Sequence, residues 1–464
     1  MQKSVQWSYK PYKPFLFDSG DIYICRVAPG KDFIHLEWLG DEGEEYSVFY
    51  RVRDEHDHPF SSVKVKTCSA TLNNLYTGAE YEFYVQKGNE KSRVRLALTG
   101  EVPGTVINYL HPEDGAYSYS GSALCSPSFV RHPDGYLLAS MDLYENNAPQ
   151  NLTLIFRSDD NGESWHYVTD LFPCYWGKLF IHKGDVYMIG TSTEYGDMLI
   201  GRSTDGGKTF PAPSVLLRGS CSNKKAGVHR SPQNIIYHKG RIYVPFEWGA
   251  WKEGYHAAMY MSCDENADLL DADNWTVTEP LKYNEGWEGV AVGPSSGCIE
   301  GTPVVAPDGR LLNIMRYDTP NTVPNYGLVL AFEINTNDPA SQLKYSHAIK
   351  LPGNMSKFMI KKDERTGAYY TIISRITDAN QIRDRSLLSL MISKDLENWE
   401  LVADIFDYRH LDRTKNGFNY IAFEIEGDDI IFQSRTALNG ARNYHDANYA
   451  TFHKIENFRN IGVK

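Results

Sequence analysis

The feature that most restricts the fold of this 464-residue chain is a strand pair split by a glycine turn, which recurs along the sequence after Gly104. The turns divide the chain into units of roughly 45 to 60 residues, a period typical of the blades of a β-propeller. They lie at Asp134-Gly135, Lys183-Gly184, Lys239-Gly240, Asp308-Gly309, Thr366-Gly367 and Glu426-Gly427. We therefore predict an all-β chain in which residues 103–464 form a six-bladed propeller.

The segment from Thr105 to Leu110 precedes the first full unit. We predict that it supplies the outer strand of the last blade, because closing the ring in this way removes an open sheet edge.

Residues 1–102 form a separate region of short alternating strands without helical periodicity, which predicts a β-sandwich. The candidate strands are Phe33 to Trp38, Tyr46 to Val52 and Tyr81 to Val85. The stretch from Leu75 to Val85 resembles fibronectin type III domains, with Tyr81 at the tyrosine-corner position and Trp38 as the core indole. The resemblance implies a module that holds or orients a partner domain and carries no chemistry.

The formal net charge of −12 argues against binding to nucleic acid or to an anionic membrane, since both need clustered Lys and Arg. An anionic substrate remains compatible with a locally basic pocket. The 31 Tyr, 20 Phe and 9 Trp residues suit sheet packing, and they equally suit the apolar faces of sugars.

The seven cysteines show no C-x-x-C spacing, so we predict free thiols and no zinc site. The sequence contains no Gly-rich phosphate loop and no convincing metal-ligand cluster, so we expect no metal and no cofactor. Residues 1–10 contain no apolar run of the kind found in signal peptides. We therefore expect a cytoplasmic protein, although removal of a leader would leave the same sequence.

A second motif recurs at the spacing of the blades. Ser158 to Trp165 and Ser203 to Phe210 match the Asp-box pattern S-x-D-x-G-x-[ST]-[WF], and degenerate copies follow at Ser262 to Trp275 and Ser393 to Trp399. In such a turn the Asp carboxylate accepts backbone N–H bonds and the Gly takes a positive φ. The aromatic residue is expected to fill the gap between neighbouring blades.

These boxes make roughly residues 105–460 resemble the sialidase superfamily, in particular sialidase-like bacterial proteins that share Ser434 to Ala437 and His445 to Tyr449. The resemblance implies a six-bladed propeller whose Asp-boxes lie on the face away from the active site. It also implies catalysis on carbohydrates.

The best local match is the segment from Glu300 to Arg316, which fits the sialidase pattern E-P-x-V-V-x-x-x-D-G-x-L-L-x-x-x-R. The resemblance places Glu300 at the catalytic glutamate and Arg316 at the second carboxylate-binding arginine. Two other family positions differ. Cys125 occupies the frame of the first arginine, and Phe418 occupies the frame of the nucleophilic tyrosine, so we predict that the protein is not an efficient sialidase.

Loops that leave the second strand and enter the first strand of each blade meet at the axis, where a pocket is expected. Carboxylates and cations together suit acid–base catalysis and recognition of an acidic sugar, since Arg can hold a carboxylate through two parallel bonds. The predicted catalytic residues are Glu300, His229, Tyr144 and Asp142. The predicted substrate-binding residues are Arg230, Arg316, Lys357, Arg375, Arg435, Glu247, His445 and Asp446. For Arg316, Arg375 and Arg435, the alternative is a structural ion pair between blades. For His445 and Asp446, the alternative is that the pair holds the final loop in place.

Three functions agree with this pattern, and each has a glycan as its partner, which we expect to be acidic. The first is an exo-acting glycoside hydrolase that cleaves a terminal uronic or sialic-acid-like sugar. The second is a lyase that acts on a uronic acid by β-elimination, with His229 or Tyr144 as the base. The third is a non-catalytic glycan-binding protein.

Overall fold

The computed structural model of the protein describes residues 6–9, 22–55 and 57–461. These residues are all-β, as predicted, and form antiparallel sheets joined by loops. The described residues also contain four short 3-10 helices. Three lie between strands, η1 (Gly115–Tyr117), η2 (Trp251–Glu253) and η3 (Ala272–Asn274), and η4 (Phe458–Asn460) follows the last strand. Among the described residues, no helix has the length and apolar character needed to cross a bilayer.

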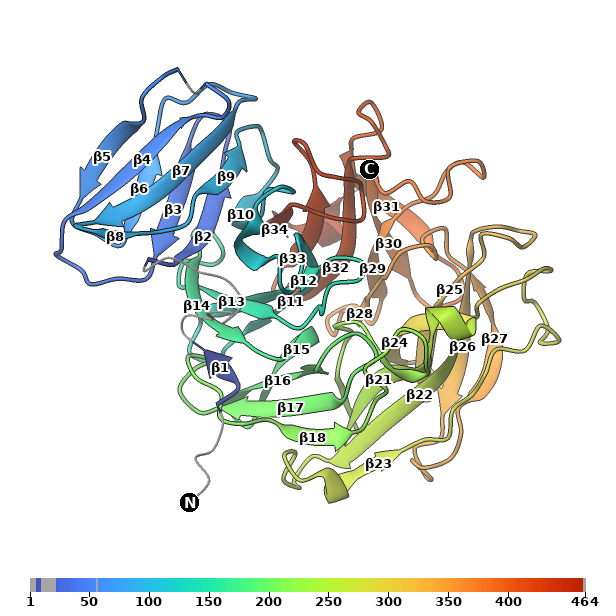
Figure 1. The fold of residues 1–464 in the computed structure, drawn as a ribbon. Coiled ribbons are helices and arrows are strands. Elements are labelled where there is room, and N and C mark those ends of the chain that lie inside the picture. The colour runs from blue at the N-terminus through green and yellow to red at the C-terminus, as the bar shows by residue number, and fades with distance from the viewer. Residues whose placement is uncertain (1–5, 10–21, 56, 462–464) are drawn as a thin grey trace.

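Within residues 105–455, all of them described, six sheets follow one another around a central axis as the blades of a sialidase-like propeller (Figure 1). From the inner strand outwards, blade 1 contains β11 (Ala123–Arg131), β12 (Leu137–Tyr144), β13 (Thr153–Ser158) and β14 (His166–Leu171), and blade 2 contains β15 (Tyr175–His182), β16 (Asp185–Thr191), β17 (Met198–Ser203) and β18 (Ser214–Leu217). Blade 3 contains β19 (Gly227–His229) and β20 (Ile236–His238), both paired with β21 (Arg241–Ala250), then β22 (Tyr255–Asp264) and β23 (Trp275–Val277).

The remaining blades repeat this order. Blade 4 contains β24 (Cys298–Val305), β25 (Leu311–Tyr317), β26 (Leu328–Ile334) and β27 (Lys344–Lys350), and blade 5 contains β28 (Ile360–Lys362), β29 (Tyr369–Ser374), β30 (Leu387–Ser393) and β31 (Glu400–Asp407). Blade 6 contains β32 (Gly417–Glu426), β33 (Asp429–Ala437), β34 (Tyr449–Ile455) and β10 (Thr105–Tyr109). The six predicted turn glycines all connect the first two strands of their blades, with φ between +61° and +96°.

The propeller is closed by the segment that the sequence singled out. Strand β10 pairs with β34, so that Thr105 faces Phe452 and Tyr109 faces Tyr449. The rings of Tyr109 and Tyr449 pack with their centroids 4.7 Å apart. The start of the propeller is therefore hydrogen-bonded to its end, which confirms the predicted closure.

Eight strands of residues 24–98 form two further sheets beside the propeller (Figure 1). One sheet contains β2 (Ile24–Pro29), β3 (Ile34–Trp38) and β6 (Ser69–Leu72), and the other contains β5 (Ser61–Val65), β4 (Tyr46–Val52), β7 (Glu80–Lys87), β8 (Glu90–Lys91) and β9 (Arg95–Leu98). Trp38 is buried between the sheets against Tyr46, with ring centroids 5.4 Å apart. The Tyr81 hydroxyl accepts a hydrogen bond from the Tyr76 amide at 2.9 Å, in the manner of a tyrosine corner.

These two sheets are tied to the propeller by a buried ion pair. Glu37 accepts a bond from Arg26 at 2.9 Å and lies 3.1 Å from the His166 ring of blade 1. Arg26 also donates to the Ile107 carbonyl of β10 at 2.8 Å. The module therefore contacts the propeller where the ring is closed.

One short strand does not follow the predicted boundary between residues 1–102 and the propeller. Strand β1 (Ser8–Tyr9) pairs with β14 as a fifth, outermost strand of blade 1. Trp7 is fully buried there, and its indole N–H donates to the Pro173 carbonyl at 2.7 Å. Strand β1 thereby pairs backbone groups that the outer strand β14 would otherwise leave open. The prediction that no signal peptide is present was based on residues 1–10. Of these, residues 1–5 and 10 lie outside the described residues.

The Asp-box turns have the predicted hydrogen bonds. Asp160 accepts bonds from the Ser164 amide at 2.8 Å and from the Ser158 hydroxyl at 2.8 Å. Gly162 has a φ of +93°, and Trp165 is fully buried against Phe452 of blade 6, with ring centroids 5.3 Å apart. The box therefore links the outer strands of one blade and fills the gap to the next.

We expect Asp160→Ala to lower the free energy of unfolding by about 1 to 3 kcal/mol, because the substitution removes hydrogen bonds to a charged acceptor. The matched control is Asp159→Ala, since Asp159 is exposed and pairs with Arg157. Its loss should be about 1 kcal/mol or less. Urea unfolding of both variants measures the difference, and equal losses would contradict a structural role for the box.

Candidate active site

Four inner strands have a β-bulge near their first residues, at the end of the propeller opposite the glycine turns. The register shifts between Cys125 and Ser128, Tyr175 and Lys178, Ile299 and Thr302, and Asn419 and Ala422. One residue in each bulge has left-handed backbone geometry: Ser126 (φ +52°), Trp176 (+51°), Glu300 (+57°) and Tyr420 (+54°). A bulge changes the direction of a side chain, and all four of these residues line one cavity.

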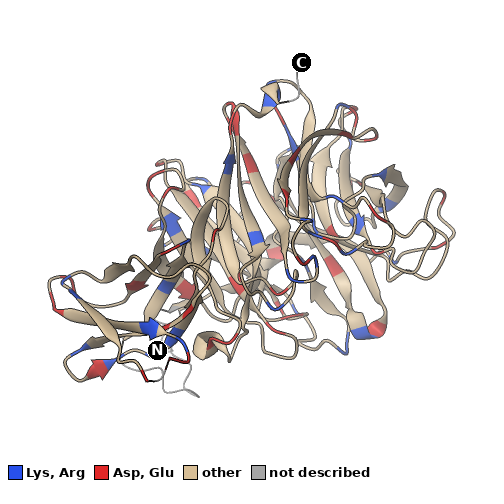
Figure 2. Ribbon diagram, turned by 90° about the horizontal axis from the view of Figure 1, so that it is seen from above, with Lys and Arg blue, Asp and Glu red and all other residues tan. Residues whose placement is uncertain are grey.

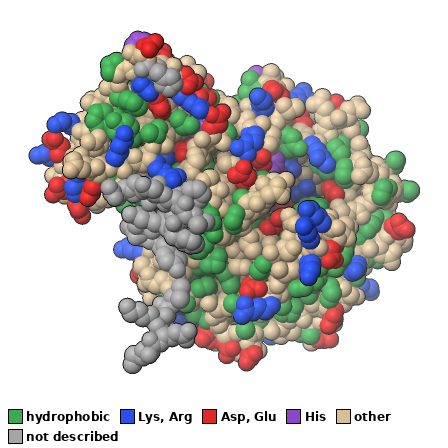
Figure 3. Space-filling view, in the orientation of Figure 1, with side chains coloured by type: hydrophobic (Ala, Val, Ile, Leu, Met, Phe, Trp, Pro, Cys, Tyr) green, Lys and Arg blue, Asp and Glu red, His purple; other side chains and the backbone are tan. Residues whose placement is uncertain are grey.

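The cavity has a volume of about 490 Å³ and receives residues from all six blades. The chain carries a net charge of −12, and its acidic and basic residues are mixed along the ribbon (Figure 2) and over the visible face (Figure 3). The described lining of the cavity is different, because it contains five Lys or Arg and three Asp or Glu residues. The cavity is therefore locally basic.

Glu300 and Arg316 form a buried ion pair on the wall of the cavity. Arg316 Nη1 donates to Glu300 Oε2 at 2.8 Å and to the Tyr420 hydroxyl at 3.3 Å. Burial alone would raise the pKa of Glu300, but Arg316 keeps it below its ordinary value. In return, Glu300 holds the pKa of Arg316 above the ordinary value despite the burial of the guanidinium. The Glu300 carboxylate and the Tyr420 phenol thus both contact the same guanidinium nitrogen, Arg316 Nη1.

Two more arginines approach Tyr420. The guanidinium carbon of Arg435 lies 5.1 Å from the centre of the Tyr420 ring, and that of Arg385 lies 5.6 Å from it. Arg385 donates to Asn419 at 2.6 Å and to the Met355 carbonyl at 3.1 Å. Burial lowers the pKa of Arg385 to about 10, so this residue remains charged at neutral pH.

The side of the cavity formed by blades 2 and 3 is aromatic. His229 lies between two indoles, with ring centroids 4.7 Å from Trp176 and 6.2 Å from Trp251. His229 Nδ1 lies 2.7 Å from Glu247 Oε2, and this pair is buried. Burial raises the pKa of Glu247, although His229 acts to lower it. The arrangement fixes the His229 ring so that one nitrogen remains for the cavity.

The structure brings together half of the predicted site residues. Those that line the cavity are Glu300, His229, Tyr144, Arg316, Arg435 and His445. The Nδ1 atom of His445 lies 3.2 Å from Arg435 Nη2 and 2.9 Å from Asp446 Oδ1. Burial and the adjacent Arg435 lower the pKa of His445 to about 3. Asp446 itself does not line the cavity and instead orients His445.

Four other predicted residues lie beneath the cavity, and this corrects the roles assigned to them. Asp142 Oδ2 accepts a bond from the Gly177 amide at 3.3 Å, and Glu247 Oε1 accepts one from the Gly301 amide at 3.4 Å. Lys357 Nζ donates to the carbonyls of Tyr420 at 3.3 Å and Ile421 at 3.2 Å. Arg230 Nη1 donates to the Trp176 carbonyl at 3.2 Å. Each of these side chains satisfies backbone groups at the bulge of a neighbouring blade.

Burial strongly affects the titration of these supporting groups. It raises the pKa of Asp142 to about 7 and lowers that of Lys357 to about 7. Burial also lowers the pKa of Arg230 to about 10.

Arg375 was predicted to bind substrate, but the structure places it in an ion pair outside the cavity. Its guanidinium pairs with Asp404 at 2.7 Å and donates to Ser389 at 2.9 Å, within blade 5. It follows β29 and does not line the cavity, because its guanidinium is held by Asp404 of the outer strand β31.

The sequence pattern alone does not identify Tyr420, because a bulge in β32 shifts the register between Asn419 and Ala422. Phe418 is fully buried against Phe406, with ring centroids 4.7 Å apart. Tyr420 lines the cavity in its place, so the absence of a tyrosine was a wrong inference. The shared register of Arg316 and Arg435, each opposite the residue before a bulge, is the signal that could have identified it.

Cys125 does line the cavity where the resemblance expected an arginine. Burial raises the pKa of its thiol to about 12, although the nearby Arg435 acts to lower it. Among the described residues, no three His, Cys, Asp or Glu side chains are grouped so that they could hold a metal ion.

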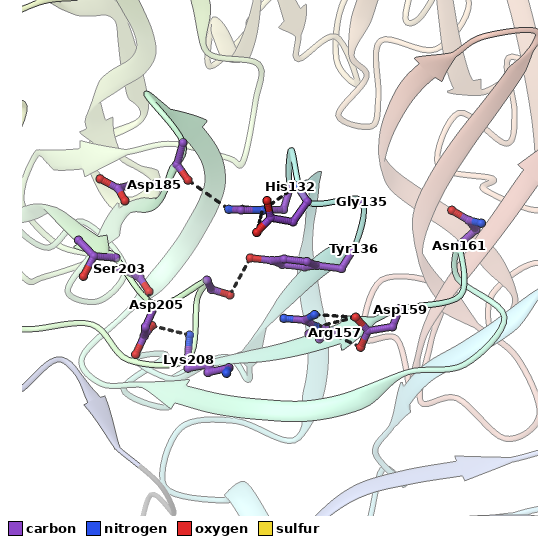
Figure 4. A pocket seen from close by; sticks show the side chains of 14 residues that line it. His132, Gly135, Tyr136, Arg157, Asp159, Asn161, Asp185, Ser203, Asp205 and Lys208 are labelled. Atoms are coloured by element: carbon purple, nitrogen blue, oxygen red, sulfur yellow. Dashed lines mark hydrogen bonds and ion pairs between the residues drawn. The ribbon is translucent and has the colours of Figure 1, made fainter.

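A larger hollow of about 780 Å³ lies between blades 1 and 2 at the opposite end of the strands (Figure 4). Turn and Asp-box residues line it, and several of them bond to one another. Arg157 pairs with Asp159 at 2.6 Å and stacks on Tyr136, with its guanidinium carbon 3.7 Å from the ring centre. The polar side chains of this hollow therefore stabilise the turns by bonding to one another.

A family model described as "BNR repeat-like domain" matches residues 179–430. No curated protein matches the sequence significantly. Among solved structures, the chain is similar to an α-L-arabinanase of Penicillium chrysogenum complexed with arabinobiose, with 16% identity, 78% of this chain and 99% of that chain covered, and a TM-score of 0.51.

Two sialidase structures are similarly distant. The Hadza microbial sialidase Hz136 shares 13% identity, with 97% of this chain and 99% of that chain covered and a TM-score of 0.51. A leech intramolecular trans-sialidase shares 10% identity, with 99% and 94% covered and a TM-score of 0.53. At these identities the likeness establishes a fold shared with glycosidases.

The burial of the Glu300–Arg316 pair can be tested through stability. Arg316→Met leaves a buried carboxylate without its partner, so we expect the free energy of unfolding at pH 7 to fall by about 3 to 5 kcal/mol. Adding Glu300→Gln should recover part of this loss, because it removes the uncompensated charge.

The matched control is Arg310→Met, since Arg310 pairs with Asp308 and Glu333 in exposed positions. Its loss should be about 1 kcal/mol or less. The same small loss for Arg316→Met would show that the site pair is not buried.

Proposed function

The chain belongs to the family of BNR repeat-like domain proteins, and we propose that it is an exo-acting glycoside hydrolase. The proposal draws on the propeller fold, which this chain shares with glycosidases. Its substrate in this proposal is a glycan that ends in an acidic sugar, of the uronic or sialic-acid type. The reaction site is the cavity that contains Glu300, Arg316 and Tyr420.

The observation that carries the proposal is the approach of three guanidinium groups to one tyrosine. Arg316, Arg385 and Arg435 lie around Tyr420 in a basic cavity of about 490 Å³, which has room for a sugar ring. Among the described residues, Arg316 Nη2 and Arg435 Nη1 have no hydrogen-bond partner. A sugar carboxylate supplies the two acceptor oxygens that these donors lack.

Tyr420 is the proposed nucleophile. A neutral phenol suits an anomeric carbon beside a carboxylate, because an anionic nucleophile would be repelled by that carboxylate. Arg316 stabilises negative charge as it develops on the phenol oxygen, since its Nη1 lies 3.3 Å away. Glu300 contacts the same nitrogen and is the proposed acceptor of the phenol proton. This removes one of the two reasons for expecting poor turnover of sialosides, and Cys125 remains the other.

A uronate lyase is the second candidate, and the buried His229–Glu247 pair is the observation that favours it. Glu247 holds His229 Nδ1 at 2.7 Å, which leaves Nε2 to take a proton α to a carboxylate neutralised by the arginines. β-Elimination produces an unsaturated sugar that absorbs ultraviolet light, whereas hydrolysis does not. The absorbance of the product therefore separates the two functions.

The two sheets of residues 24–98 are proposed to act as a fibronectin type III-like module. Support comes from the Trp38 core, the hydrogen bond to Tyr81 and the contact of Glu37 with blade 1. Its proposed role is to brace the closed edge of the propeller.

The proposal predicts turnover of sialosides or uronate-capped glycosides and little turnover of the matched neutral glycosides. Arg385→Met and Arg435→Met should each raise KM roughly ten- to a hundredfold, because each removes a charge-assisted contact of about 1.5 to 3 kcal/mol. Tyr420→Phe should lower kcat by roughly 10³-fold or more, since the covalent route is then closed.

Arg375→Met is the control for the arginine variants, because Arg375 pairs with Asp404 outside the cavity. Its kinetic constants should match those of the wild type. Equal turnover of acidic and neutral glycosides, or full activity of Tyr420→Phe, would contradict the proposal.

A further inference from the structure

Resting on the proposed hydrolase function, we infer that Glu194 is the residue that protonates the oxygen of the leaving group. It lies in the turn between β16 and β17 of blade 2, at the cavity, and is half-buried. The sialidase resemblance assigned no role to this position.

The turn that carries Glu194 is held by backbone hydrogen bonds. The Ser192 amide donates to the Asp197 carbonyl at 2.9 Å, and the Gly196 amide donates to the Thr193 carbonyl at 2.9 Å. The next residue, Tyr195, has a left-handed φ of +57°, and its carbonyl accepts bonds from the amides of residues 220 and 221 at 3.0 and 2.9 Å. A group held on such a turn keeps its position during a reaction, as an acid catalyst must.

The contacts of the carboxyl groups in the cavity separate their roles. Glu194, Glu300 and Asp318 are the acidic residues among the described lining. Glu300 pairs with Arg316 at 2.8 Å, and Asp318 accepts a bond from the Ser296 hydroxyl at 2.6 Å. Glu194 has no hydrogen bond or ion pair with any described residue, so its carboxyl group is the one available to a substrate.

The surroundings of Glu194 also favour its protonated form. Burial raises the pKa of Glu194, and His229 acts to lower it. Glu194 also acts on the pKa of Tyr144, Tyr175 and Tyr195, and these neighbours supply no positive charge. Since the pKa of Glu300 moves in the opposite direction, the two carboxyl groups are separated into an acid and a base.

The proposed step balances as follows. The Tyr420 oxygen bonds to the anomeric carbon while its proton passes to Glu300. The bond from that carbon to the leaving oxygen breaks, its electron pair stays on the oxygen, and the Glu194 proton joins it. In the second half, the Glu194 carboxylate takes a proton from water, the water oxygen bonds to the anomeric carbon, and Tyr420 leaves and regains its proton from Glu300.

The test compares Glu194→Gln with the wild type on two substrates that carry the same acidic sugar. One has 4-methylumbelliferone as the leaving group, which departs without protonation, and the other has a second sugar, which needs a proton. We expect kcat/KM for the disaccharide to fall by roughly 10²- to 10⁴-fold, while kcat/KM for the aryl substrate falls less than about tenfold. The alkaline limb of the pH profile on the disaccharide should also disappear.

Glu145→Gln is the matched control, since Glu145 follows β12 at the same end of the propeller but does not line the cavity. Its kinetics on both substrates should match those of the wild type. Equal losses on the two substrates, or no loss on the disaccharide, would overturn the assignment of Glu194 while the proposed hydrolase function stands. A wild-type protein that cleaves neither substrate nor any other acidic glycoside would overturn both.

Discussion

The cavity depends on one backbone constraint, the left-handed residue in the bulge of four inner strands. Holding a bulky residue in this region costs about 1 to 3 kcal/mol, so the surroundings must stabilise it. The stabilising groups come from neighbouring blades. Asp142 bonds to the amide after Trp176, Glu247 to the amide after Glu300, and Lys357 to the carbonyl of Tyr420. Blades 1, 3 and 5 therefore maintain the bulges of blades 2, 4 and 6, and these parts of the cavity depend on contacts between blades.

This arrangement explains why so many charged groups are buried without contacting a substrate. A bulge leaves backbone N–H and C=O groups outside the strand ladder, and such groups are costly to bury without partners. Ionised or ionisable side chains make stronger hydrogen bonds than neutral ones. The result is a layer of polar residues beneath the cavity and a second set, including Arg316, Arg385 and Arg435, that faces it.

At the opposite end of the propeller, the glycine turns and Asp-boxes are each formed by residues close together in the chain. Glycine turns join the first two strands of each blade, and Asp-boxes join the outer strands where the motif occurs. Strand β10 then pairs with β34, so the ring is closed by backbone hydrogen bonds. Because these devices lie away from the cavity, the residues around Glu300 can be arranged for chemistry without loss of the fold.

The sequence by itself determined the all-β class, the turn glycines, the Asp-boxes, the closing strand and the match of Glu300 and Arg316. The turn and Asp-box signals are local, since each depends on residues close together in the chain. The tertiary structure decided which side chains enter the cavity. Tyr420 replaces Phe418 there because a bulge, held by Lys357 of another blade, shifts the register. Arg385 joins it from a loop with no motif, so only the packing of blades 5 and 6 reveals its place.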